Sequence, residues 1–159
     1  MSNNNPTTQS QPPGDEAADS NKPTSSSSDH NHTSTSTAPN FILLSEACSS
    51  SLQSLLEHYQ KHDWHDFSTA GRSHVALTLA KEHIFKSSLE TFKKDNPHTS
   101  KEPIYKTIPD YFGYGVKVEM KLEEECPTNV GKPYIITTVH ECYFNGEGRL
   151  ESVNKRILN

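Results

Sequence analysis

The alternation of apolar and polar residues between Tyr114 and Glu123 constrains the fold more than any other feature of this chain. Five apolar residues at even positions alternate with five small or charged residues at odd positions: Tyr114, Val116, Val118, Met120 and Leu122 against Gly115, Lys117, Glu119, Lys121 and Glu123. This period of two belongs to a β-strand, because successive side chains of a strand point to opposite faces of the sheet. The segment predicts a half-buried antiparallel strand with its charged face in water.

Three further segments are predicted to join this strand. Residues 134–144 are rich in β-branched and aromatic residues and predict a central strand covered on both faces. Asn145-Gly-Glu-Gly148 favours a tight hairpin, with Asn-Gly supplying positive φ values. Residues 149–158 predict a last strand. Leu150 is at an even position while Val153 and Ile157 are at odd ones, so this strand needs a bulge to keep all three in the sheet. A short strand over 104–108 precedes the aromatic turn 110–115.

Two helices are predicted before the strands. Apolar residues recur at three- and four-residue steps from Phe41 to Tyr59, which indicates one helical stripe that ends near Lys61. A second helix is expected from a cap at Ser73 to about Lys94, because Pro97 disfavours helix at the residue before it. The order indicates an α+β fold: two helices followed by a curved antiparallel meander of three or four strands.

The first 40 residues differ in composition from the rest. Their hydrophobic residues are Met1, Ala17, Ala18 and Ala38, within a background of Ser, Thr, Asn, Pro and Gln. Such a segment cannot bury enough apolar surface to offset its chain entropy. We therefore expect a disordered tail over 1–40 and a single α+β domain over 41–159, which is too short for two cores.

The expected architecture resembles a known group of folds. A helix that precedes a curved sheet, together with a last hairpin that ends in Gly-Glu-Gly-Arg-Leu150, is similar to the cystatin-like group. That group includes the cone-shaped nuclear-transport-factor-2-like (NTF2-like) and SnoaL-like domains. The resemblance is architectural and covers residues 41–158. It implies a pocket between helix and sheet and a tendency to dimerise through the sheet, and it transfers no catalytic residue.

Charge and cysteine usage exclude several classes of function. The formal net charge is -5, and Lys93-Lys94 and Lys155-Arg156 are the adjacent basic pairs, so we expect no nucleic-acid partner.

No apolar run approaches the roughly 18 residues of a membrane span, and the N-terminus lacks the pattern of a signal peptide. We expect no membrane partner and a cytoplasmic or nuclear location. Three cysteines without a C-x-x-C pair are expected to be reduced thiols.

One histidine cluster could bind a metal ion. On a continuous helix, His58, His62 and His65 would share a face at i, i+4 and i+7, a spacing that can bring imidazoles to zinc or copper. Asp63 or Asp66 would then orient them. The alternative is a set of surface histidines that complement the dipole at a helix C-terminus.

A second set of residues could serve acid-base chemistry in a pocket. His140 lies on a predicted central strand, and Tyr114, Tyr134 and Asp63 could converge with it around a small apolar ligand. The alternative is a strand histidine that is hydrogen-bonded within the sheet or exposed on its face.

No sequence motif supports a nucleophile, a phosphate loop or a dinucleotide site, so no cofactor is expected. The leading hypothesis is therefore a non-catalytic protein-interaction or adaptor module that dimerises or binds a protein partner through its sheet. The competing hypothesis is a small-pocket NTF2/SnoaL-like enzyme or ligand carrier, with metal binding as a weaker third alternative. An enzymatic role is uncertain and less favoured.

Overall fold

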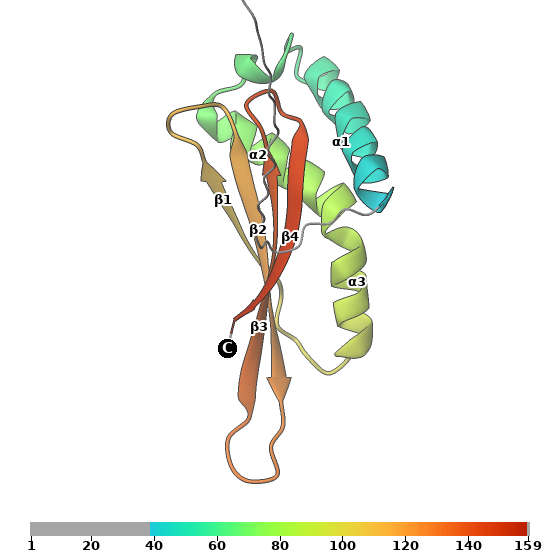
Figure 1. Ribbon diagram of the computed structural model, residues 1–159, viewed down its shortest axis with the longest axis vertical. Coiled ribbons are helices and arrows are strands. Elements are labelled where there is room, and N and C mark those ends of the chain that lie inside the picture. The colour runs from blue at the N-terminus through green and yellow to red at the C-terminus, as the bar shows by residue number, and fades with distance from the viewer. Residues whose placement is uncertain (1–38, 159) are drawn as a thin grey trace, which may run out of the picture. The chain divides into compact units, whose positions relative to one another are not determined.

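The computed structural model describes residues 39–158, in which three helices precede a four-stranded antiparallel sheet (Figure 1). The α+β class is confirmed. The tail predicted over 1–40 lies outside the described residues, apart from positions 39 and 40. Those two residues begin α1 (Pro39–His58), so the helix starts two residues before the expected boundary.

The apolar stripe of α1 packs as its spacing predicts. Cys48, Leu52 and Leu56 are buried at successive four-residue steps, while Phe41 and Leu44 pack against the core from the first turns. The serines between them leave this helix with modest intrinsic propensity, so its stability comes from the buried stripe. A short 3₁₀ turn, η1 (Trp64–Asp66), then leads into the second helix.

The single second helix that the sequence predicts is interrupted. It begins at Ser68 rather than Ser73, because the Ser68 hydroxyl accepts a hydrogen bond of 3.1 Å from the Gly71 amide. After α2 (Thr69–Leu79) comes a π turn, η2 (Ala80–Ile84), and then α3 (Lys86–Asp95). Ile84 and Phe85, at the end of this turn, are both buried. As expected, the helical region ends just before Pro97.

The four strands form a meander in chain order. They are β1 (Ile104–Pro109), β2 (Val116–Cys126), β3 (Tyr134–Phe144) and β4 (Leu150–Leu158), and each pairs antiparallel with the next. The alternation in β2 is confirmed, because Val116, Val118, Met120 and Leu122 are buried and the lysines and glutamates between them are not. Tyr114 lies just before the strand.

The expected bulge is present at the start of β4. Phe144 pairs with Leu150 while Tyr143 pairs with Ser152, so Glu151 is the extra residue. This shift places Leu150 and Val153 on the same side of the sheet. The positive φ of the hairpin lies at Gly148 (79°) rather than at Asn145 or Gly146, which corrects the expected turn geometry.

The helices cover one face of the sheet, and the core lies between the two layers. Its most deeply buried side chains include Trp64, Leu79, Phe85, Val118, Met120 and Phe144. The expectation that β3 is covered on both faces is wrong, because no second layer exists among residues 39–158 (Figure 1). The described residues also hold no hairpin between the helices and the long strands, where the cone-shaped domains usually carry one.

Candidate functional site

The candidate functional site is a groove between α3 and the adjoining half of the sheet. Although α3 is amphipathic, it buries none of its residues, since its two large apolar side chains, Leu89 and Phe92, are only half-buried. A groove of about 380 Å³ therefore remains between helix and sheet. Its lining comes from α3, the residue after it and the helix side of three strands: Ser87, Ser88, Thr91, Phe92, Asp95, Asn96, Leu122, Glu124, Thr138, His140 and Lys155.

His140 is the one sequence-predicted candidate that lines this groove. It lies on β3 between Met120 of β2 and Lys155 of β4. Its side chain is half-buried, and burial, followed by the nearby charge of Lys155, lowers its pKa below the ordinary 6.5. A neutral imidazole can accept or donate a hydrogen bond, which suits ligand binding or proton transfer.

A second hollow adjoins the first at the N-terminal end of α3. It encloses about 400 Å³ between the start of α1, the π turn and β4, and it shares Ser87 and Ser88 with the first groove. Phe41, Leu44, Ile84 and Val153 give it an apolar lining. The two hollows meet at these two serines, and the pair is apolar at one end and polar at the other. We call it the α3 groove.

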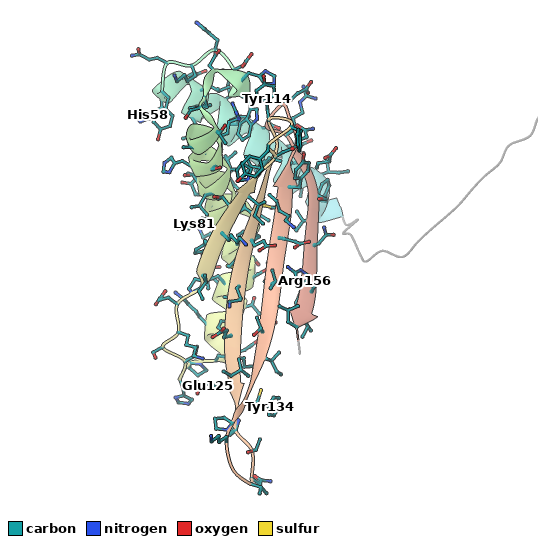
Figure 2. All side chains as sticks on the ribbon, turned by 90° about the vertical axis from the view of Figure 1, so that its left-hand side faces the viewer. His58, Lys81, Tyr114, Glu125, Tyr134 and Arg156 are labelled. Atoms are coloured by element: carbon teal, nitrogen blue, oxygen red, sulfur yellow. The ribbon has the colours of Figure 1, made fainter. Side chains whose placement is uncertain are left out.

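The structure does not bring the other acid-base candidates to His140. Figure 2 shows Tyr114 and Tyr134 at opposite ends of the sheet. Tyr134 pairs with Cys126 next to the loop that joins β2 and β3, and it is exposed. Asp63 caps the 3₁₀ turn by accepting a hydrogen bond of 2.6 Å from the His65 amide. These residues therefore share no pocket with His140.

Tyr114 instead belongs to a structural cluster near η1. Its carbonyl oxygen accepts a hydrogen bond of 2.7 Å from the indole of Trp64. The guanidinium of Arg72 lies 4.8 Å from the centre of the Tyr114 ring. The His65 ring packs edge-on against the same tyrosine ring, with 4.6 Å between the two ring centres. Because Trp64 and Arg72 are both buried, this cluster fixes the β1–β2 turn to the helices.

The histidines predicted as metal ligands do not share a helical face. α1 ends at His58. Two residues later, Gln60 adopts the left-handed conformation with a φ of 58°, so the chain leaves the helix there. The continuous helix that the hypothesis required is therefore absent. His62 donates its backbone amide to Asp66, and His65 lies 3.6 Å from the Asp63 carboxylate. Within residues 39–158, no three His, Cys, Asp or Glu side chains are grouped so that they could hold a metal ion.

One close polar pair has no signal in the sequence. The Ser51 hydroxyl on α1 lies 2.6 Å from Nε2 of His83 on the π turn, and Glu82 lies 3.9 Å from that same nitrogen. In a catalytic triad the carboxylate contacts the opposite ring nitrogen. The pair therefore joins α1 to the π turn rather than forming a charge-relay arrangement.

Comparison of the chain with family models, curated proteins and solved structures gives no match in any of the three. The likeness to cystatin-like domains therefore stays one of element order. None of the helices in residues 39–158 is both long and apolar enough to cross a membrane.

Proposed function

We propose that this chain is a non-catalytic protein-interaction or adaptor module that dimerises or binds a protein partner through its sheet. The observation that carries the proposal is that the helices cover only one face of the four-stranded sheet (Figure 1). The other face, here called the open face, follows from the strand register. It consists of residues 104, 106 and 108 of β1, the odd residues 117–125 of β2 and 135–143 of β3, and the even residues 152–158 of β4.

Four charged side chains at the centre of the open face pair with one another. Arg156 lies 3.3 Å from both Glu119 and Glu141, and Lys117 lies 3.5 Å from Glu119. A partner that covers this face would therefore meet charges that are already satisfied within the sheet. Isolated buried charges would oppose association, whereas paired charges reduce that cost.

Exposed apolar side chains lie on the open face between this charged centre and the β2–β3 loop. Ile104 on β1, Ile135 on β3 and Leu158 on β4 are 53%, 48% and 40% exposed. A partner that covers this part of the face would bury these aliphatic side chains, which favours association. Among residues 39–158, β4 is an edge strand, and its outer backbone groups pair with no other strand of the sheet.

Sedimentation velocity of the full chain over a range of concentrations tests the proposal. A dimer is the expected result if the open face binds a second copy. If the chain is monomeric, a protein partner retained by the wild type should be lost when the open face is altered. A monomeric chain that retains no partner would contradict the proposal.

A second candidate function is supported by the α3 groove. A helix that covers a sheet without burying any residue leaves room for a small ligand, as in a ligand carrier or a small-pocket enzyme of the NTF2/SnoaL kind. In an enzyme, the half-buried His140 would act as the base. Substitution His140→Gln distinguishes a ligand carrier from an enzyme, because a carrier would still bind its ligand while an enzyme would lose turnover.

A further inference from the structure

The two ends of the α3 groove differ in chemistry. At the end near α1, the hollow of about 400 Å³ is lined mainly by Phe41, Leu44, Ile84 and Val153. At the other end, His140 and Lys155 project from neighbouring strands beneath α3. Val153 and Lys155 are two residues apart on β4 and therefore face the same side of the sheet. A single elongated ligand can contact both ends.

We propose that the α3 groove binds an amphiphile with an anionic head, such as a medium-chain acyl carboxylate, with its head at Lys155 and its aliphatic chain between α1 and β4. This inference rests on the second candidate function, the ligand carrier, and names its ligand class. It is independent of the open face, which lies on the other side of the sheet.

The placement of charges selects an anionic head. Within residues 39–158, Lys155 has no carboxylate oxygen within 4.0 Å, so its ammonium group is available to a ligand. The hydroxyl of Ser88 and the half-buried imidazole of His140 line the same end and can donate hydrogen bonds to a carboxylate.

The acidic residues of the groove lie away from this head position. Glu124 pairs with Ile136, which is four residues along β3 from His140, a separation of about 13 Å in a strand. Asp95 is seven residues along α3 from Ser88, or about 10 Å in a helix. Both carboxylates therefore lie toward the far end of the polar hollow, and the end next to the apolar hollow carries the cation.

Isothermal titration calorimetry of the full chain with three probes tests the assignment. The probes are decanoate, 1-decanol and decyltrimethylammonium, each below its micelle concentration. We expect decanoate to bind most tightly, 1-decanol about tenfold more weakly, and the cationic probe least well. Substitution Lys155→Gln should bring the affinity for decanoate close to that for 1-decanol. Lys93→Gln, on α3 but outside both hollows, is the matched control and should bind as the wild type does.

A second pair of variants tests the apolar end. Val153→Phe should fill the hollow and weaken binding of decanoate and 1-decanol alike. Leu43→Asn changes an exposed lining residue that the core does not need, so it should weaken both probes even if Val153→Phe fails to fold. Equal binding of the three probes, with no effect of Lys155→Gln, would overturn the anionic head while leaving a ligand groove. If no probe binds, both the inference and the carrier function fail.

Discussion

The backbone amide of Lys61 donates a hydrogen bond of 2.8 Å to the carbonyl oxygen of Leu56, and the amide of Gln60 donates one of 3.1 Å to Glu57. These two bonds form a Schellman motif, which ends α1. The motif requires the left-handed conformation at Gln60, where φ is 58°. This turn is the physical reason why His58, His62 and His65 do not form a stripe.

Substitution Gln60→Gly should stabilise the protein. Glycine adopts positive φ without a Cβ penalty, so we expect a gain of about 0.5 to 1 kcal/mol in the free energy of unfolding. The matched control is Gln53→Gly in the middle of α1, which should cost about 1 kcal/mol. Urea denaturation measures both. Two changes of the same sign would contradict the assigned end of α1.

Neighbouring residues of β2 should respond very differently to substitution. Val118 is completely buried against the helices, so Val118→Asp should cost about 3 to 5 kcal/mol, close to the whole stability of a small domain. Lys117 lies on the open face, and Lys117→Gln should change stability by no more than about 0.5 kcal/mol. Thermal melts followed by circular dichroism compare them. Equal effects would refute the strand orientation.

The lowered pKa of His140 should make stability depend on pH. The unfolded chain binds a proton near the ordinary pKa of 6.5, whereas folded His140 does so only at lower pH. Below about pH 6.5 the unfolded state therefore binds more protons, and the free energy of unfolding falls as pH falls. His140→Gln should remove this component in urea titrations between about pH 5 and pH 7.5.

The cause of the lowered pKa can be tested separately. Burial is the larger cause and Lys155 the smaller, so Lys155→Gln should raise the pKa of His140 without restoring the ordinary value. An NMR titration of the imidazole Cε1 proton reports this directly. An unchanged pKa would show that Lys155 does not act on His140.

The three thiols should differ in reactivity. Burial raises the pKa of the Cys48 thiol to about 12, and it also raises that of Cys142, so both remain protonated and enclosed in the core. Cys126 is partly exposed at the end of β2. Ellman's reagent should therefore label one thiol in the native protein and three in the unfolded protein. Labelling of Cys48 or Cys142 at the same rate as Cys126 would contradict the core.

Sequence patterns predicted the sheet well because its signals are local. The alternation of buried and exposed residues in β2 and the bulge between Leu150 and Val153 both follow from side-chain alternation, and both are confirmed. The break between α2 and α3 could not be predicted in this way. The residues of the π turn, Ala80–Ile84, carry no proline or glycine that would mark a break in the helix, so no local pattern predicts their altered hydrogen bonding.

The candidate site was less accessible to sequence reasoning. The strand pattern predicts His140 as a candidate, and the structure places it in the α3 groove. Its contact with Lys155 depends on the register of β3 and β4, which the bulge at Glu151 sets. The separation of Asp63 from His140, and the pairing of Ser51 with His83, depend on tertiary packing that no local pattern records.

Binding through the open face is the central claim, and matched lysine substitutions test it most directly. Ile104→Lys together with Ile135→Lys places two cations on the open face, where both side chains are about half exposed. Ile42→Lys on α1 is the control, since Ile42 is 62% exposed on the helical layer.

Sedimentation velocity of the wild type and these two variants is the deciding measurement. We predict that the wild type associates, that the double variant associates about a hundredfold more weakly, and that Ile42→Lys behaves as the wild type does. If the chain binds a different protein, the same order should hold for that partner. Equal association of all three proteins, or a wild type that binds neither itself nor a partner, would contradict the claim.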